Sequence, residues 1–277
     1  MGRGARVLIE RLRGRQRFDK ELGQHFLHDE SVLDSIMHLA ELSEQDSVIE
    51  IGPGPGSLTE RLLEAGVNLY CIELDSGACS NLLEIFPSLN LIEGDALEVK
   101  WPTVNKIVAN IPYQISSPLI ELITKKKEIN HVVILVQEEF AERLVIASVA
   151  DRGSLGMCVA MDWECKMENK VPSHCFIPAP KVNSRLVTMK RKDAPSQSRL
   201  AKMLIRQAFE YRRKKLRNTL SKVPKRISRI KGWHASLYRD ALQSIDSDFL
   251  DKRPEELSFE EWIELAQKFA DYLSSEG

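Results

Sequence analysis

The sequence predicts an α/β fold, a doubly wound parallel sheet followed by a small C-terminal helical domain. Strand-like apolar runs alternate with helix-like segments over about residues 31–150, as in doubly wound sheets. Glycine or acidic residues follow three successive strand-like runs, and a polar-aromatic stretch follows a fourth. A linker of turn-forming residues at 192–198 then precedes a region of helical periodicity.

The predicted elements can be stated in chain order. Strands are expected at 47–51, 68–72, 89–93, 106–109 and 132–136, with helices at 31–42, 57–63, 116–127 and 137–150. Residues 157–165 and 185–190 are predicted as two further strands, forming an antiparallel edge. Four helices are expected beyond the linker, at 199–211, 213–221, 236–243 and 258–274.

The stretch Asn110-Ile111-Pro112-Tyr113 follows a predicted buried strand, and its proline prevents a helix from starting at once. It therefore lies at the carboxyl edge of the sheet, where open α/β sheets bind ligands. The Asn110 carboxamide oxygen and the Ile111 carbonyl can accept both N–H groups of an exocyclic amine. Tyr113 can stack on the base, a contact worth roughly 1–3 kcal/mol. An Asx turn beside a core tyrosine is the alternative for this stretch alone.

Three earlier strand ends carry residues suited to a nucleoside cofactor. A glycine-rich turn, Gly52-Pro53-Gly54-Pro55-Gly56, lets a ligand approach the backbone closely. Glu73 ends the next strand and can bind both ribose hydroxyls, and Asp95 can accept a hydrogen bond from an adenine amine. A dinucleotide site is the rival, but the glycine spacing is GxGxG rather than GxGxxG. With residues 110–113, this series predicts an S-adenosylmethionine site beside a site for an amino group.

Motifs along almost the whole chain carry a resemblance to a known family. They are Leu22-Gly23-Gln24-His25-Phe26-Leu27, Glu50-Ile51-Gly52-Pro53-Gly54, Glu73-Leu74-Asp75, Gly94-Asp95-Ala96, Asn110-Ile111-Pro112-Tyr113, Phe176-Ile177-Pro178-Ala179-Pro180-Lys181-Val182-Asn183-Ser184 and Phe209-Glu210-Tyr211-Arg212-Arg213-Lys214. In order and spacing the chain resembles the KsgA-type rRNA adenine N6,N6-dimethyltransferases. The Gln-Ile-Ser-Ser-Pro run after Tyr113 is more similar to the archaeal and eukaryotic branch.

The resemblance implies roles for individual residues and a class I, Rossmann-like methyltransferase domain at 21–192. The implied cofactor-binding residues are His25, Leu27, Gly52, Gly54, Glu73, Asp95 and Asn110. The implied catalytic set is Asn110, Ile111, Pro112 and Tyr113, with Phe176 clamping the target base opposite the tyrosine. Lys181 is expected to meet a phosphate. The family often has asparagine where His25 stands, and a core position is the alternative for Phe176.

The net charge of −1 conceals a strong separation of charge along the chain. Residues 199–231 contain thirteen lysines and arginines and a single acid, and the tail then turns acidic. Such a separation is typical of a polyanion binder, although a solvated helix face is the alternative. We therefore predict a helical RNA-binding domain at 199–277, with Arg212, Arg213 and Lys214 as RNA contacts.

The arginine-rich residues 1–20 are predicted to form a flexible RNA-binding arm. A mitochondrial transit peptide is less consistent with the sequence, because Glu10 and Asp19 interrupt the run and serines are absent.

The composition, 43% hydrophobic and 29% charged, fits one large and one small domain. No apolar run approaches the roughly 20 residues of a membrane span. Five cysteines without a CxxC pair suggest neither disulfides nor a metal site, and they favour a reducing cytoplasm. Nothing requires more than a monomer.

The predicted function is dimethylation of two adjacent adenosines near the 3′ end of small-subunit rRNA during ribosome biogenesis, using S-adenosylmethionine. The expected partner is a pre-ribosomal particle. The alternatives are a large-subunit rRNA methyltransferase of the antibiotic-resistance type, a mainly non-catalytic assembly factor, a mitochondrial transcription factor of the same descent, and a DNA adenine methyltransferase.

Overall fold

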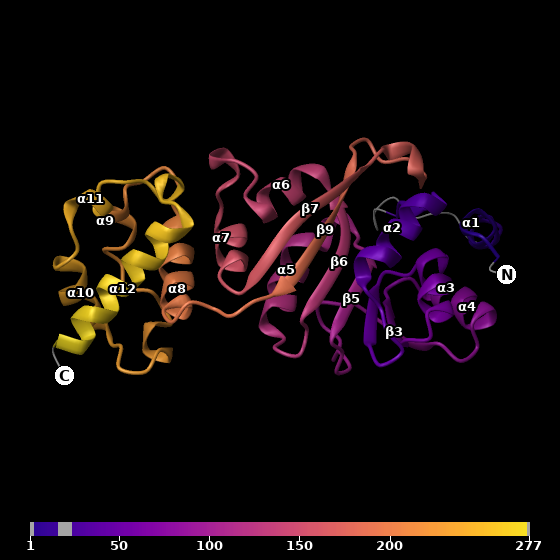
Figure 1. The fold of residues 1–277 in the computed structure, drawn as a ribbon, viewed down its shortest axis with the longest axis horizontal. Helices are drawn as coiled ribbons and strands as arrows, with labels where there is room; N and C mark the ends of the chain where they lie inside the picture. Colours follow the sequence, from indigo (N-terminus) through magenta and orange to yellow (C-terminus); the bar gives the residue numbers. More distant parts are fainter. Residues whose placement is uncertain (1–2, 16–23, 276–277) are drawn as a thin grey trace. The chain divides into compact units, whose positions relative to one another are not determined.

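The structure is a computed structural model that describes residues 3–15 and 24–275 (Figure 1). The chain divides into two compact units. The first comprises Met1–Ala141 and Cys165–Arg191, and the second comprises Glu142–Glu164 and Lys192–Gly277. Residues 142–164 therefore belong with the C-terminal helices and not with the predicted methyltransferase domain at 21–192.

A seven-stranded sheet forms the centre of the first unit. Its order is β4 (Asn90–Glu93), β3 (Asn68–Glu73), β2 (Ser47–Ile51), β5 (Lys106–Asn110), β6 (His131–Gln137), β9 (Ser184–Arg191) and β7 (Trp163–Val171). The strands from β4 to β6 pair in parallel, and β9 runs antiparallel to β6. Figure 1 labels β3, β5, β6, β9 and β7 in this sequence across the sheet. The predicted parallel sheet with an antiparallel partner at its edge is confirmed.

The strand order reverses between β2 and β5. The chain moves outward from β2 to β3 and β4, then returns to place β5 on the other side of β2. Loops that leave the carboxyl ends of β2 and β5 therefore diverge and open a crevice, the usual ligand site of such sheets. The glycine-rich turn follows β2, and residues 110–113 follow β5.

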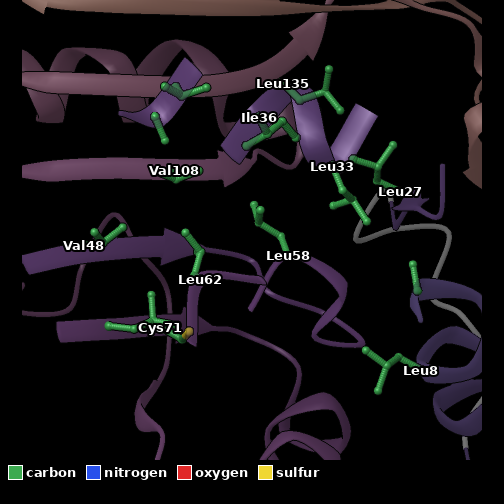
Figure 2. Packing of buried hydrophobic residues seen from close by; sticks show 14 of the residues in the cluster. Leu8, Leu27, Leu33, Ile36, Val48, Leu58, Leu62, Cys71, Val108 and Leu135 are labelled. Atoms are coloured by element: carbon green, nitrogen blue, oxygen red, sulfur yellow. The ribbon is translucent and has the colours of Figure 1, made fainter. Parts of the chain in front are cut away.

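Helices of the first unit bury apolar side chains against the strands. These helices are α1 (Ala5–Arg13), α2 (Glu30–Ala40), α3 (Ser57–Glu64), α4 (Ser76–Ile85), α5 (Ser116–Lys125) and the start of α6 (Glu138–Val145). Leu33, Leu58 and Leu62 are buried in one core cluster with Val48 and Val108 of the strands (Figure 2). This packing fixes the strand ends from which the site residues project.

Helix α1 differs from the predicted flexible arm. Leu8, Ile9 and Leu12 are fully buried because they recur on one face of the helix, so this segment docks through an apolar stripe. Its cations are also engaged: Arg11 and Arg15 form ion pairs with Glu84. Part of the expected arm, residues 16–20, lies outside the described residues.

A two-stranded sheet joins segments that are far apart in the sequence. Strand β1 (Phe26–Leu27) pairs antiparallel with β8 (Phe176–Ile177), with Phe26 opposite Ile177 and Leu27 opposite Phe176. This pairing brings the motif around His25 next to the proline-rich loop.

The second unit is helical around its own core. Its helices are the end of α6, α7 (Ser154–Ala160), α8 (Ser198–Phe209), α9 (Leu216–Thr219), α10 (Ala235–Gln243), α11 (Ser247–Leu250) and α12 (Phe259–Ser275). Tyr238, Trp262 and Phe269 are fully buried in this core. Short 3₁₀ turns complete the chain at Tyr113–Ile115, Val149–Asp151, Ser173–Cys175, Ile227–Arg229 and Pro254–Glu256. Among the described residues, no helix combines the length and apolarity needed to cross a bilayer.

The prediction of a strand at 157–165 is wrong. Residues 154–160 form α7, and strand β7 starts only at Trp163. Met157 and Met161 are buried in the helical core. A short, fully buried apolar run does not distinguish a strand from a helix, and tertiary packing decides here.

Candidate functional site

A cavity of about 170 Å³ opens at the carboxyl edge of the sheet, at the crevice described above. It is lined by Gln24, His25, Phe26, Ile51, Gly52, Gly54, Ile72, Glu73, Leu74, Gly94, Asp95, Ala96 and the segment from Asn110 to Ile115. All four predicted strand ends therefore contribute to one site. The strand ends that the sequence singles out thus lie together, and the roles of their residues stay predictions.

The glycine-rich turn lies directly against the cavity wall. Gly52 and Gly54 have φ values of 69° and 56°, in the left-handed region that glycine adopts without a Cβ penalty. A Cβ at Gly54 would come within 2.6 Å of the Phe26 ring, and one at Gly52 within 3.2 Å of Pro112. Both positions thus require glycine, and both line the cavity.

Glu73 is held in place by three backbone N–H groups. Gly54 N donates to Oε2 at 2.9 Å, while Leu74 N and Asp75 N donate to Oε1 at 2.8 and 2.9 Å. Burial raises the pKa of the Glu73 carboxyl, and these three hydrogen bonds act in the opposite direction. The carboxylate links the β2 and β3 loops and retains acceptor sites for ligand hydroxyls.

Asp95 occupies the corresponding place after β4. Leu97 N donates to its Oδ1 at 2.8 Å, and its carbonyl accepts from Glu98 N and Val99 N. The residue therefore starts a turn whose geometry fixes its side chain at the cavity.

Asn110 has a defined amide orientation. Its Nδ2 donates to the His25 carbonyl at 3.0 Å, which leaves Oδ1 as the acceptor of this carboxamide. The following residue is anchored as well, because Ile111 N donates to the Leu135 carbonyl at 3.2 Å. The main chain after β5 is thus fixed where its acceptors line the cavity.

Tyr113 and His25 form an aromatic pair at the cavity. Their ring centroids are 5.6 Å apart with an interplanar angle of 28°. Hydrogen bonds orient both rings: the Tyr113 hydroxyl lies 2.7 Å from Ser184 Oγ, and His25 Nδ1 donates to the Pro178 carbonyl at 2.7 Å. Burial raises the pKa of the Tyr113 phenol, which keeps it neutral.

These residues fit S-adenosylmethionine by their chemistry. The positive-φ turn offers close backbone approach, Glu73 offers carboxylate oxygens for ribose hydroxyls, and Asp95 offers an acceptor for an adenine amine. Ile51, Ile72 and Leu74 provide apolar surface in the same cavity.

Comparison with known proteins agrees with this geometry. The family described as "Ribosomal RNA adenine dimethylase" matches residues 15–232. The chain belongs to this family. The "Ribosomal RNA small subunit methyltransferase A" of Prochlorococcus marinus (strain NATL1A) is 37% identical over 269 residues, covering 90% of this chain and 89% of the relative. That of Clostridium botulinum (strain Okra / Type B1) is 39% identical over 219 residues, covering 74% and 80%.

Solved structures also resemble this dimethylase-family chain. A dimethyladenosine transferase from Plasmodium falciparum has a TM-score of 0.72 and 28% identity, with 90% of this chain and 98% of that chain covered. The 23S rRNA methyltransferase ErmE has a TM-score of 0.64 and 22% identity, covering 88% and 99%, and shows the shared fold. Both curated relatives named above are bacterial, so the likeness of residues 114–118 to the archaeal and eukaryotic branch stays a prediction.

Two predicted site residues do not line the cavity of this dimethylase-family chain. Phe176 is 2% exposed in the hydrophobic core and is paired with Leu27 across the β1–β8 ladder. In this position its ring is buried in the core, and a clamp opposite Tyr113 stays a prediction. Leu27 is likewise a core residue and lines only a small pocket behind the glycine-rich turn. The pairing of these two residues fixes the adjacent cavity residues. Leu27 directly follows Phe26 of the cavity wall, and Phe176 precedes the loop whose Pro178 carbonyl accepts from His25.

Sequence reasoning left several cavity residues unassigned. Phe26, Leu74 and Gln114 line the site, together with Gln24, whose amide donates to Asp75 Oδ2 at 2.9 Å. Leu74 has a signal in the sequence, because it is a large apolar residue between two acids at a predicted strand end; in the structure it is 54% exposed. Phe26 had none, since its contact with Gly54 depends on a tertiary approach.

The predicted RNA contacts lie outside the cavity. Arg212 forms an ion pair with Glu255 and donates to the Ala150 carbonyl. Arg213 and Lys214 are exposed, with Lys214 Nζ 4.6 Å from the Tyr211 ring centroid. Lys181 is exposed in the loop before β9. Contact of these four residues with RNA remains a prediction.

Proposed function

We propose that this chain transfers methyl groups from S-adenosylmethionine to N6 of two adjacent adenosines near the 3′ end of small-subunit rRNA. The substrate is a pre-ribosomal particle in the cytoplasm, and the chain acts on it as a monomer. Membership of the rRNA adenine dimethylase family and the names of the curated relatives support the reaction and the RNA. The cavity supports the cofactor.

The orientation of Asn110 is the observation that carries this proposal. Because Nδ2 is committed to the His25 carbonyl, Oδ1 is the oxygen that can accept an N–H from an adenine amine. The Ile111 carbonyl is the second acceptor. Two acceptors on one amine favour a pyramidal nitrogen whose lone pair is available for attack.

Catalysis in this site rests on positioning and electrostatics. S-adenosylmethionine, when bound, supplies a methyl group activated on a sulfonium. Asn110 and the Ile111 carbonyl orient the amine, and the ring of Tyr113 supports the extruded base. Methyl transfer makes the nitrogen cationic and acidic, so it loses its proton to water. A dedicated general base is therefore not required.

Dimethylation imposes a further condition on the same acceptors. After the first transfer the amine has one N–H left, so either Asn110 Oδ1 or the Ile111 carbonyl loses its donor. The second transfer therefore depends on the remaining acceptor and on the stacked base. We expect it to be the slower of the two.

The large-subunit alternative has less support. The likeness to ErmE is at 22% identity and shows the fold alone. A non-catalytic assembly factor would not need Asn110, Glu73 and Asp95 to meet in one cavity.

Methyl transfer to purified ribosomal subunits tests the proposal. Labelled S-adenosylmethionine is incubated with this protein and with unmethylated small or large subunits. We expect label in small-subunit RNA only. Label confined to large-subunit RNA, or binding of small subunits without transfer, would overturn the proposal.

A further inference from the structure

The basic run of the second unit is divided by its internal ion pairs. Arg212 forms an ion pair with Glu255, and Asp251 forms ion pairs with both Lys215 and Arg217. Two carboxylates of the acidic tail therefore pair with three cations in the first part of the run. Cations that are already paired within the unit gain less from a phosphate, because the existing partner must be displaced.

The second part of the run has no such compensation. We define the basic segment 222–231 by its five cations, Lys222, Lys225, Arg226, Arg229 and Lys231. All five are exposed, and none forms an ion pair with a carboxylate of the residues that the structure describes. No acidic residue occurs anywhere between positions 211 and 239.

Apolar anchors give this segment a defined conformation. Pro224, Ile227 and Trp233 are buried in or against the helical core. Successive backbone bonds, from Ile227 N to Pro224 O and from Trp233 N to Ile230 O, hold the turns between them at 3.0 and 3.1 Å. These buried residues are three and six positions apart, and the exposed cations of the basic segment, Lys222 apart, lie between them. The cations therefore project from an ordered backbone.

The surface suits a phosphate backbone better than an acidic protein. None of the large, exposed apolar side chains of the described residues lies in the segment, so it offers no anchor for a protein interface. Closely spaced, uncompensated lysines and arginines are the features that neutralise phosphates and release counterions.

We propose that the basic segment 222–231 is the principal phosphate-binding surface of the second unit. It contacts the backbone of the substrate RNA and positions the particle without reading bases. This inference rests on the proposed function, since it takes rRNA to be the partner. It assigns the greater share of salt-sensitive affinity to residues beyond Arg212, Arg213 and Lys214.

A matched pair of double variants tests this proposal in the full chain. Lys225→Gln with Arg229→Gln removes two cations of the basic segment. Lys215→Gln with Arg217→Gln also removes one lysine and one arginine, but both of these cations form ion pairs with Asp251. The affinity for unmethylated small subunits is measured by filter binding over a series of KCl concentrations.

We expect the first variant to bind roughly tenfold more weakly at physiological salt. The slope of log K against log[salt] should become shallower by about 0.7–0.9 for each phosphate that the variant no longer neutralises. The second variant should retain the wild-type slope. Equal losses in both variants, or a wild-type slope in the first, would overturn the proposal.

Further measurements exclude other causes of weaker RNA binding. Cofactor affinity and the thermal midpoint show whether each variant is folded. The double variant Lys222→Gln with Arg226→Gln repeats the binding test at two other positions of the basic segment. Methyl transfer by the wild type reports on the proposed function separately. If the first variant changes the salt slope but the wild type transfers no methyl groups, the basic segment is still a phosphate-binding surface. The proposed methyltransferase function would then be contradicted.

Discussion

The orientation of the Asn110 side chain is fixed by the backbone of a residue that is distant in the sequence. Its amide hydrogen bond to the His25 carbonyl decides which end of the carboxamide is available to the substrate. The sequence predicts an acceptor after β5. It does not predict what fixes that acceptor, because His25 is 85 residues away in the chain.

Replacing Asn110 by alanine should slow catalysis strongly and spare cofactor binding. We expect the methyl-transfer rate to fall by roughly 10²–10³, as for the loss of one preorganised hydrogen bond to a reacting group. Single-turnover transfer and calorimetric titration of S-adenosylmethionine measure the two effects.

Asn90→Ala is the matched control, since the Asn90 amide also donates to a backbone carbonyl, Leu69 O at 3.0 Å, but does not line the cavity. If cofactor affinity falls as far as turnover in Asn110→Ala, the residue is chiefly a binding residue.

Glu50 is a buried acid beneath the glycine-rich turn. Burial raises the pKa of its carboxyl from an ordinary 4.5 to about 8; hydrogen bonds from Thr59 and Cys71 act in the opposite direction. The folded protein therefore holds this proton more tightly than the unfolded chain. The resulting stability is fully present below about pH 4.5 and is lost as the pH rises through about 8.

Glu50→Gln should remove that pH dependence. The free energy of unfolding of the variant, relative to wild type, should rise between pH 5.5 and 7.5 by on the order of 1 kcal/mol per pH unit. Urea unfolding of both proteins at several pH values measures this difference. A difference that does not vary with pH would show that Glu50 is ionised in the folded protein.

At the scale of elements, the site is made by loops that the strand order brings together. The strand ends after β2, β3 and β4 are recognisable from their glycine and acidic residues, and the end of β5 from its polar-aromatic stretch, so most of the cavity was predictable from the sequence. Its remaining wall comes from the short strand β1, whose pairing with β8 has no local signal. The burial of Phe176 has no local signal either, because it depends on this ladder.

The glycine-rich turn should not tolerate a side chain at Gly54. In Gly54→Ala, a Cβ within 2.6 Å of Phe26 and a left-handed φ of 56° both displace the turn. We expect S-adenosylmethionine affinity to fall by roughly tenfold or more, the equivalent of about 1.4 kcal/mol. Calorimetric titration measures the change.

Gly66→Ala is the control for backbone strain alone. Its φ of 72° is also left-handed, but the nearest atom to an added Cβ is Glu44 Cγ at 3.5 Å, away from the cavity. It should lower the thermal midpoint without changing cofactor affinity. Equal effects of both substitutions on affinity would refute a specific role for the turn.

At the scale of the whole molecule, charge separation along the sequence overstates the charge available to a partner. Ion pairs inside the fold engage two arginines of the N-terminal cluster and three cations of the basic run, with Glu84, Glu255 and Asp251 as their partners. Composition predicted a polyanion-binding unit, but it could not show which cations stay uncompensated, because their partners are tens of residues away.

Asp251→Asn should release Lys215 and Arg217 for RNA. We expect tighter binding of small subunits and a salt slope that is steeper by about 0.7–0.9 for each newly engaged phosphate. Asp271→Asn removes the same charge from the same unit, but its carboxylate accepts from Gln267 rather than from a cation, so the slope should not change. Equal slopes for the two variants would contradict the charge balance described above.

Mass spectrometry of small-subunit RNA, after reaction with the wild type and with Asn110→Ala, tests whether this site dimethylates adenine. We expect N6,N6-dimethyladenosine at two adjacent positions near the 3′ end with the wild type and unmodified adenosine with the variant. Monomethylated adenosine as the final product, or the same dimethylation by Asn110→Ala, would contradict the account.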